Sequence, residues 1–424
     1  MYLIHKKNCR VCKSTTLTKV IDLGEQYLQG SFIKPGKDEP PKIRFPTSLV
    51  FCNPALNENS CGLLQMEYTV LPEILYKNYW YRSGINKTMR EHLKGITEEA
   101  ALLVKKQKAL VLDIGCNDGT LLNFYPKDFQ KYGIDPSNIA AEAGSDINII
   151  VDFFPSDKLI KVLNGQKFDV VTSIAMFYDL EDPIIFAKSI KEILSTEGIW
   201  IFEMSYMPTM LEMLSYDTIC HEHLEYYSLS VIEYILNKAG MRLFNVSLNS
   251  INGGSFRCYA TSSDSSIYDS KEFKQNIENL HYKERKLELN TEKSYKHFQK
   301  SVDAHKLEMK KLLSKLKQEG KKIHVYGAST KGNTILQWCE IDNKIIDVAA
   351  ERNPDKYGAR TIGTNIPIVS EAESRAMNPD YYLVLPWHFK EEILERERET
   401  LNKGVGLIFP LPVVEVIKKQ SIRL

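Results

Sequence analysis

Short apolar runs that alternate with helical patterns define the middle of the chain. Four such runs occupy residues 109–115, 131–137, 168–177 and 198–205. Apolar runs of this length, separated by helix-forming stretches, are typical of buried strands in a parallel sheet with helices on both faces. A helical pattern over 85–107 precedes them, and residues 228–260 add a helix and a strand pair that could complete the sheet. The pattern predicts a doubly wound α/β domain.

The two flanks differ from this centre. Residues 1 to about 70 are loop-rich and have little hydrophobic core of their own, so they need an additional stabilising cross-link. From about 270 to 318 the chain is charged, and its apolar residues recur mostly at spacings of three, four or seven, which predicts an amphipathic helix pair. Strand patterns at 324–333, 347–354 and 380–388 then indicate a second, smaller α/β domain. The predicted division is an N-terminal module over 1–75, a central α/β domain over 76–262, a helical linker over 263–320 and a smaller C-terminal α/β domain over 321–424.

Composition narrows the class of protein only slightly. The hydrophobic fraction of 43% and charged fraction of 26% are close to those of globular proteins, and 424 residues are too many for one ordinary core. A formal net charge of +1 gives no electrostatic argument for nucleic acid or a membrane surface as a partner. No apolar run approaches the roughly 18 to 20 residues that span a bilayer. The start shows no apolar signal region, so a cytoplasmic enzyme is expected.

Half of the eight cysteines cluster near the start of the chain. Cys9 and Cys12 form a C-x-x-C pair that can bind one metal ion through two thiolates. Cys52 and Cys61 can complete a tetrahedral four-sulfur shell that suits a structural zinc ion. The eight residues between Cys52 and Cys61 make a wider gap than a usual zinc knuckle has. The alternatives are free thiols with a chance C-x-x-C, or a redox pair, although no strand–helix frame surrounds the motif.

A glycine-rich turn follows the first central strand. VLDIGCNDG (111–119) places Asp113, Gly115 and Gly119 between a buried strand and a helix, where backbone N–H groups are open to a ligand. Asp118 in the turn would repel a pyrophosphate, whereas a cationic sulfonium with an adenosine fits. Asp135, at the next strand end, can accept both ribose hydroxyls. The predicted cofactor set is Asp113, Gly115, Asn117, Asp118, Gly119, Asp135 and Pro136, and with FDVVTSIAMFYDLEDP (168–183) it resembles class I S-adenosylmethionine (SAM) dependent methyltransferases.

A polar, aromatic segment, SYDTICHEHLEYYS (215–228), carries the candidate acid–base chemistry. His221 and His223 flank Glu222, a spacing that projects both rings to one side only in an extended backbone. A histidine held by a carboxylate is a common general base. A satisfied polar cluster at a helix start and a metal site are the alternatives, and the segment lacks the H-E-x-x-H pattern of helical zinc sites.

Over essentially its full length the chain resembles the sugar C-methyltransferases of nucleotide-deoxysugar pathways. The resemblance rests on eight motifs in order: Cys9-x-x-Cys12, CGLLQ (61–65), YWYRSG (79–84), DIGCNDGTLL (113–122), HEHLEYYS (221–228), NGGS (252–255), YGASTKGN (326–333) and RNPDKYG (352–358). It implies three parts: an N-terminal zinc-binding domain, a central SAM domain and a C-terminal Rossmann-like domain.

The resemblance also implies a reaction. These enzymes remove the proton at C3 of a nucleotide-linked 4-keto sugar, and the enolate attacks the SAM methyl group. It assigns the acid/base position to His223 and a substrate-orienting carboxylate to Glu222. It places Tyr81 and Ser83, two further predicted cofactor-binding residues, on the element that covers the site. The chain departs from the family where Cys220 replaces a tyrosine and Tyr178-Asp179 replaces a histidine. His221 could substitute for that tyrosine, or His223 could act alone.

The C-terminal unit offers candidate substrate contacts. Lys331, at the start of a helix, can pair with a phosphate, and Arg352 can add a bidentate diphosphate contact. The expected substrate-binding set is Asn252, Lys331, Asn333, Arg352 and Asn353, with Trp387-His388 as part of the cleft wall. A domain without a ligand is the alternative, and the helices of 270–318 are a candidate homodimer surface. The rival functions are an O- or N-methyltransferase on a similar sugar and a non-catalytic scaffold.

Overall fold

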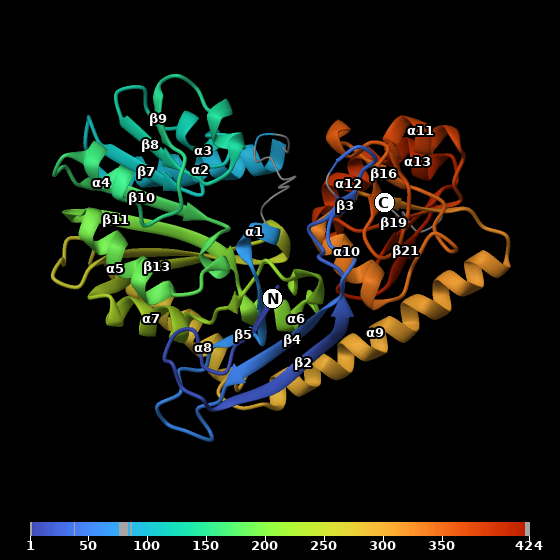
Figure 1. Ribbon diagram of the computed structural model, residues 1–424, viewed down its shortest axis with the longest axis horizontal. Coiled ribbons are helices and arrows are strands. Elements are labelled where there is room, and N and C mark those ends of the chain that lie inside the picture. Colours follow the sequence, from blue (N-terminus) through green and yellow to red (C-terminus); the bar gives the residue numbers. More distant parts are fainter. Residues whose placement is uncertain (1, 38, 76–83, 85–86, 420–424) are drawn as a thin grey trace.

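The computed structural model describes residues 2–37, 39–75, 84 and 87–419. Two α/β bodies stand side by side, and a long antiparallel sheet and the helix α9 (Lys293–Gln318) run beneath both of them (Figure 1). The first body holds the central part of the chain and the second holds the C-terminal part. The N-terminal segment forms most of the sheet that joins them.

The central body is built on one large mixed sheet. Among the described residues, seven strands pair in the order β13-β14-β11-β10-β7-β8-β9, and only β14 runs antiparallel to its neighbours. This confirms the doubly wound sheet and the strand pair that closes it. The strands are β7 (Leu110–Ile114), β8 (Gln130–Ile134), β9 (Ile147–Ile150), β10 (Phe168–Ile174), β11 (Leu194–Ser205), β13 (Met241–Asn249) and β14 (Ser255–Ser262).

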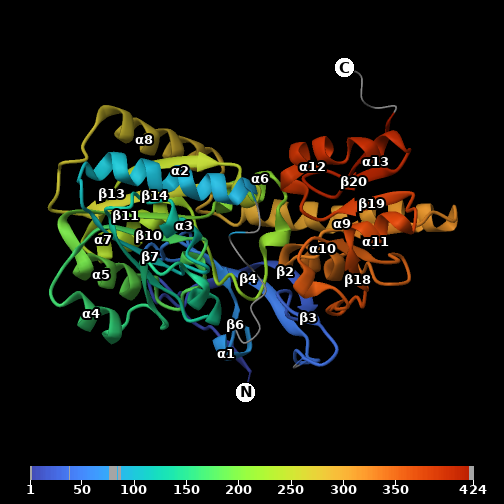
Figure 2. The same ribbon diagram turned by 90° about the horizontal axis from the view of Figure 1, so that it is seen from above.

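Helices cover both faces of this sheet (Figure 2). One face packs against α2 (Lys87–Val104) and α3 (Thr120–Asn123), and the other packs against α4 (Asp157–Leu163), α5 (Pro183–Ile193) and α7 (Leu229–Lys238). The fully buried strand β7, with the pattern LVLDI, has apolar neighbours on both sides, which is why its run is continuous rather than alternating. A further helix, α8 (Lys271–Lys286), packs against β13.

The N-terminal segment forms a four-stranded antiparallel sheet with a strand borrowed from the central body. Its order is β12-β5-β4-β2 within the described part of the chain. The borrowed strand β12 (Glu225–Tyr226) follows the histidine segment, so this sheet fixes that segment in space. The other strands are β2 (Leu17–Gln26), β4 (Phe45–Cys52) and β5 (Leu64–Met66); β1 (Leu3–His5) pairs with β6 (Tyr68–Val70), ahead of α1 (Pro72–Leu75).

The C-terminal body has a sheet in the order β18-β16-β15-β19-β20-β21, parallel except for the last strand. Its strands are β15 (Ile323–Tyr326), β16 (Ala349–Glu351), β18 (Ile368–Ser370), β19 (Tyr381–Val384), β20 (Gly406–Phe409) and β21 (Glu415–Ile417). Its helices are α10 (Thr330–Trp338), α11 (Glu371–Ala376), α12 (Lys390–Arg396) and α13 (Arg398–Asn402). A short pair, β3 (Phe32–Ile33) with β17 (Arg360–Thr361), ties the N-terminal segment to this body.

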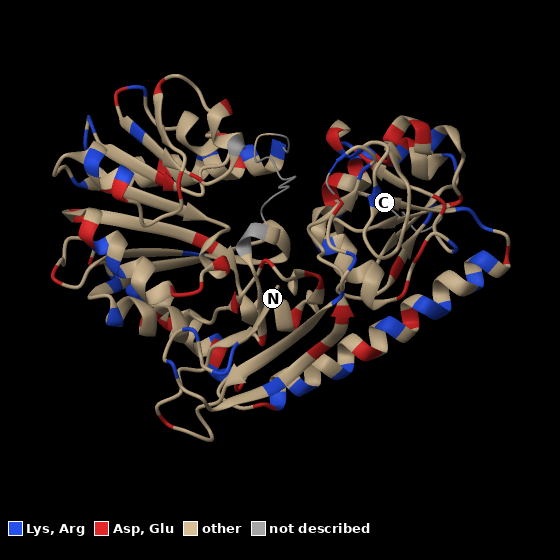
Figure 3. Ribbon diagram, viewed as in Figure 1, with Lys and Arg blue, Asp and Glu red and all other residues tan. Residues whose placement is uncertain are grey.

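The two predicted linker helices have different roles. The apolar stripe of α9, which includes Phe298, Val302 and Met309, is buried in one core with β2 and the C-terminal sheet. Figure 3 marks the many lysines of the same helix, which are exposed or half-buried. The apolar stripe of α9 is therefore covered by this chain itself, and a homodimer surface on the helices of 270–318 stays a prediction. No helix in the described ranges is both long and apolar enough to cross a membrane.

Candidate functional site

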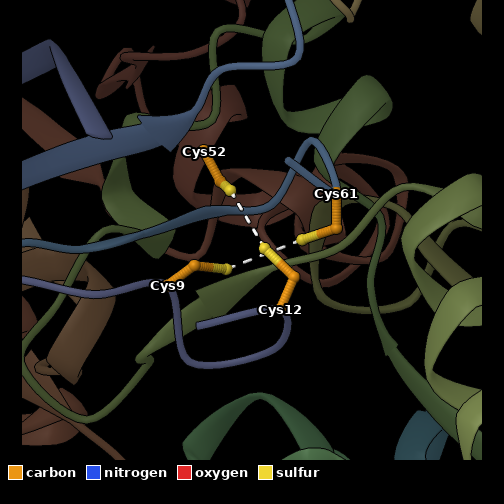
Figure 4. A group of neighbouring side chains, drawn as sticks. All are labelled: Cys9, Cys12, Cys52 and Cys61. Carbon is orange, nitrogen blue, oxygen red and sulfur yellow. Dashed lines mark hydrogen bonds between the residues drawn. The ribbon is translucent and has the colours of Figure 1, made fainter. Parts of the chain in front are cut away.

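Four cysteine thiols meet where the N-terminal segment folds back on itself (Figure 4). Cys9 and Cys12 flank a tight loop, Cys52 ends β4, and Cys61 lies in the loop before β5. The four Sγ atoms all lie within 4.8 Å of one another. The shortest separations are 3.5 Å between Cys9 and Cys61 and 3.4 Å between Cys12 and Cys52. A disulfide bond needs about 2.05 Å, so all four are separate thiols.

This cluster fits a zinc ion. Four thiolates at about 2.3 Å from zinc complete a tetrahedral shell in which neighbouring sulfurs lie about 3.8 Å apart, and no position is left for water. The role of such a centre is structural. The cysteines pack in the same apolar cluster as α5 and α7, and Lys13 Nζ lies 2.9 Å from Oδ2 of Asp182, which caps α5. The metal would therefore hold the N-terminal segment against the central body.

The predicted glycine turn joins β7 to α3. Gly115, Asn117 and Gly119 have φ angles of 75°, 49° and 73°, and the N–H of Gly115 donates to the carbonyl of Ile134 at 2.8 Å. A Cβ on Gly119 would stand 2.8 Å from Cβ of Ala143, so only glycine fits. The turn thus depends on left-handed backbone conformations that favour glycine and asparagine.

Two carboxylates stand at adjacent strand ends beside this turn. Asp113, at the end of β7, accepts a hydrogen bond from Thr172 Oγ1 at 2.7 Å, and burial, aided by the charge of Asp135, raises its pKa to about 7. Asp135, after β8, accepts the N–H of Asn117 at 3.0 Å and the N–H of Ser137 at 2.8 Å. Carboxyl groups at these two positions suit a sulfonium and ribose hydroxyls.

Other predicted cofactor residues lie next to Asp135 and in the glycine turn. Pro136 is exposed next to Asp135. Asp118 accepts hydrogen bonds from Thr120 Oγ1 at 2.6 Å and from the N–H of Gly84 at 2.9 Å, which brings the end of the YWYRSG motif to the turn. Tyr81 and Ser83 of the same motif lie outside the described residues.

The histidine segment forms a turn, and its two histidines have different neighbours. His221 is buried against the N-terminal sheet, where Nδ1 lies 2.6 Å from Gln29 Oε1. Its Nε2 lies 3.2 Å from Thr47 Oγ1 and 3.3 Å from the carbonyl oxygen of Phe45. Both ring nitrogens are thus engaged within the protein. This geometry makes His221 a structural contact and argues against it as a base.

His223 has the geometry of a base. Its Nδ1–H donates to the carbonyl oxygen of Thr218 at 2.8 Å, which leaves the lone pair on Nε2. Its ring lies 4.2 Å from that of Tyr178. Burial and the positive charge of Lys331 lower the pKa of His223 to about 4, so the ring is neutral at physiological pH. The ring lines a small cavity with Tyr178, Ser205, Met207, Met210, Thr218, Glu225 and Tyr226.

Cys220 and Tyr178-Asp179, where the chain departs from the family pattern, lie near His223 and Glu222. Cys220 is fully buried, and burial together with Glu222 and Asp179 raises the pKa of its thiol well above the usual range. The thiol therefore stays protonated and is not a base in place of the tyrosine. Burial also raises the pKa of Glu222, and burial with the charge of Glu222 raises that of Asp179. Glu222 Oε2 and Asp179 Oδ1 have no hydrogen-bond partner among the described residues.

The C-terminal body packs against the segment that precedes the histidines and against the loop of Asn252. Lys331, in the first turn of α10, donates from Nζ to the carbonyl oxygen of Asn252. Trp387 Nε1 donates to Asp217 Oδ2 at 2.8 Å, so the loop that contains η7 (Trp387–Phe389) lies against the segment that precedes the histidines. Burial and the charge of Lys331 lower the pKa of His388 to about 3. Trp387-His388, predicted as part of a cleft wall, thus lie close to the predicted substrate residues Asn252 and Lys331.

The remaining predicted substrate residues have other contacts. Asn333 is buried and donates from Nδ2 to the carbonyl oxygen of Gln29 at 2.7 Å, which links α10 to the N-terminal segment. Asn353 is buried and its Oδ1 accepts the N–H of Asp355 at 3.0 Å, beginning a short 3-10 turn. Arg352 is exposed beside it. Of these three residues, Arg352 alone presents an open charged side chain.

Two residues of this site are not predicted by the sequence pattern. Asp217 and Thr218 lie in η4 (Tyr216–Thr218), just before the histidines, and one contacts Trp387 while the other fixes the tautomer of His223. The polar, aromatic composition around them is the signal that points to this segment. Their roles depend on a backbone carbonyl and on a partner 170 residues away, which spacing does not reveal.

Comparison with known families matches three consecutive parts of the chain. A zinc-binding domain model matches residues 9–76, a methyltransferase domain model matches 85–246, and a model described as the C-methyltransferase C-terminal domain matches 250–412. The curated C-methyltransferase NovU of Streptomyces niveus is 24% identical over 422 residues, which cover 97% of each chain.

Among the solved structures with some similarity are methyltransferases whose match covers less than half of this chain. A SAM-dependent methyltransferase from Clostridium acetobutylicum shares 12% identity at a TM-score of 0.34, over 41% of this chain and 92% of that one. The magnesium protoporphyrin IX methyltransferase of Synechocystis, solved with bound SAH, shares 17% identity at a TM-score of 0.33, over 43% and 90%.

Proposed function

Because the chain is a SAM-dependent methyltransferase of the three-domain C-methyltransferase family, we propose that it methylates the carbon next to the ketone of a nucleotide-linked 4-keto deoxysugar. SAM, when bound at the glycine turn, supplies the electrophilic methyl group. The observation that carries the proposal is the neutral imidazole of His223, whose Nδ1–H is held by the Thr218 carbonyl and whose pKa is lowered by burial and by Lys331 of the C-terminal body.

In this proposal His223 removes the proton. Its Nδ1–H is held by the carbonyl of Thr218, so Nε2 is the nitrogen that accepts a proton from carbon. The ketone makes that proton acidic, so no metal is needed for the chemistry. Glu222 would orient the sugar, because its carboxyl group is buried beside the histidine and one of its oxygens has no partner among the described residues.

The remaining roles follow the same division. Asp113 and Asp135 would hold the sulfonium and ribose of SAM, and Arg352 would contact the diphosphate as a bidentate donor. Tyr81 and Ser83 would cover the site. The domain boundaries at residues 75, 262 and 320 are also part of the proposal. The linker between the last two boundaries includes α8, which packs on the central sheet.

The test is incubation with SAM and a panel of nucleotide-linked 4-keto sugars in D2O, followed by NMR of the sugar. A new methyl group on carbon would support the proposal and identify the position. A methyl group on oxygen or nitrogen would favour a hydroxyl or amine acceptor instead. No SAM binding at all would reject an enzymatic role and favour a scaffold.

A further inference from the structure

We propose that Lys331 is a catalytic residue that donates a hydrogen bond to the enolate oxygen, so that the C-terminal body takes part in the chemistry. The sequence pattern alone suggests a phosphate contact for this lysine. The inference rests on the proposed function, because an enolate oxygen forms only if the enzyme removes a proton next to a ketone.

The packing of α10 places Lys331 next to the segment that carries His223. The helix packs on η4, the turn that precedes the histidine segment, and Thr334 Oγ1 lies 3.4 Å from the carbonyl oxygen of Ile219. On the other side Nζ reaches the carbonyl of Asn252, in the loop between β13 and β14. The ammonium is therefore fixed between two loops of the central body, and Thr218 of the first loop lines the cavity of His223.

The hydrogen bonds of Lys331 leave capacity for a ligand. An ammonium has three N–H donors, and among the described residues Nζ donates to one acceptor, the Asn252 carbonyl. The nearby carboxylate is Asp217, which has one oxygen taken by Trp387. Burial lowers the pKa of Lys331, and the charge of Asp217 acts in the opposite direction. In its ammonium form, with donors to spare, Lys331 is an electrostatic stabiliser that needs little reorganisation when charge develops.

The reaction needs such a group. When His223 Nε2 takes the proton from carbon, the C–H electron pair moves to the ketone oxygen, which becomes an enolate. A base with a pKa of about 4 is weak, so most of the driving force must come from stabilising that oxygen. The carbon then bonds to the methyl group as the methyl–sulfur bond breaks, and the proton on His223 leaves to solvent. Lys331 keeps its own proton throughout.

The experiment compares Lys331→Met with Lys356→Met in the full-length protein. Lys356 is the matched control: it is also a largely enclosed lysine of the C-terminal body, and its Nζ donates to the Ala328 carbonyl at 2.7 Å. Two quantities are measured with a sugar that the unmodified enzyme accepts. They are the rate of hydrogen–deuterium exchange at carbon without SAM, and the dissociation constant of the corresponding nucleoside diphosphate.

We expect Lys331→Met to slow the exchange by about 10² to 10³-fold. The dissociation constant should stay within about twofold, and Lys356→Met should change neither quantity by more than that. Unchanged exchange in Lys331→Met would overturn the inference. So would a loss of exchange matched by an equal loss of nucleoside diphosphate binding, which would make Lys331 a phosphate contact. If the unmodified enzyme exchanges no 4-keto sugar, the proposed function itself is rejected.

Discussion

Replacing each histidine of the HEH segment by asparagine separates the two roles that the structure gives them. Asparagine Nδ2 occupies nearly the place of histidine Nδ1, so both variants can keep one hydrogen bond of the original ring. In His223→Asn the retained bond is the one to the Thr218 carbonyl, and the substitution removes Nε2, the proposed base. In His221→Asn the retained bond is the one to Gln29, and the substitution removes the hydrogen bonds that Nε2 makes with the N-terminal sheet.

The expected magnitudes follow from these hydrogen bonds. Loss of a general base slows the chemical step by about 10² to 10⁴-fold, or about 3 to 5 kcal/mol in activation free energy. His223→Asn should therefore lose methyl transfer and carbon-bound exchange by that factor, while its SAM dissociation constant stays within about twofold. His221→Asn leaves buried polar groups without a partner, so it should lose about 1 to 3 kcal/mol of stability with less than about tenfold change in rate.

The assay is steady-state methyl transfer and exchange in D2O, with SAM affinity by calorimetry and the thermal unfolding midpoint of each variant. We expect a crossed pattern, in which one variant is slow and stable and the other is active and less stable. A His221→Asn variant that is fully stable but inactive would refute the assignment of the base. So would normal exchange by His223→Asn.

Three further outcomes are expected. The purified protein should carry about one zinc ion per chain, and Cys12→Ser should lower both the zinc content measured by elemental analysis and the thermal midpoint; a metal-free protein of equal stability would contradict this. The rate of hydrogen–deuterium exchange at the sugar carbon should be independent of pH near neutrality and fall as the pH drops through about 4, because protonation of His223 removes its lone pair. In Lys331→Met a positive neighbour of His223 is gone, so the pKa of His223 rises and the fall in rate should move to higher pH. Gly24→Ala, at φ 68° in open space, should lower the free energy of unfolding by about 1 kcal/mol. Gly119→Ala also places a methyl group 2.8 Å from a neighbouring carbon, so it should weaken SAM binding about tenfold or more by calorimetry. Equal behaviour of the two variants would exclude the steric explanation.

Local patterns carry enough information for most of the fold. The apolar run at 109–115 forms β7, buried on both faces, and the helical pattern over 85–107 forms α2 (Lys87–Val104). These elements can be predicted because their burial follows from their own sequence. The pairing of β12 with β5 cannot, because it joins Glu225 to Gln65 across the chain and depends on how two domains meet.

The site shows the same limit. The spacing of His221 and His223 places them two residues apart but does not say that the backbone turns between them. The start of α10 resembles a phosphate-binding helix start, so the sequence favours a phosphate as the partner of Lys331; only the packing of α10 on η4 reveals its place beside the imidazole. The cysteine ligands, in contrast, are predictable, because thiols that bind one metal need little besides proximity.

The N-terminal module helps to shape the proposed active site as well as stabilising the chain. Gln29 accepts hydrogen bonds from the backbone and ring of His221 through its side chain, and its carbonyl oxygen accepts one from Asn333 of the C-terminal body. At the next residue, a Cβ on Gly30 would overlap an oxygen of Glu222, so the carboxyl group is packed directly on this backbone. Two consecutive residues of the zinc module thus contact both other parts of the chain at the loop that carries the proposed base. If zinc is lost, the strand pairing that holds this dipeptide loosens, and the loop loses its support on one side. For that reason we expect methyl transfer to fall together with zinc content, although the metal takes no part in the chemistry.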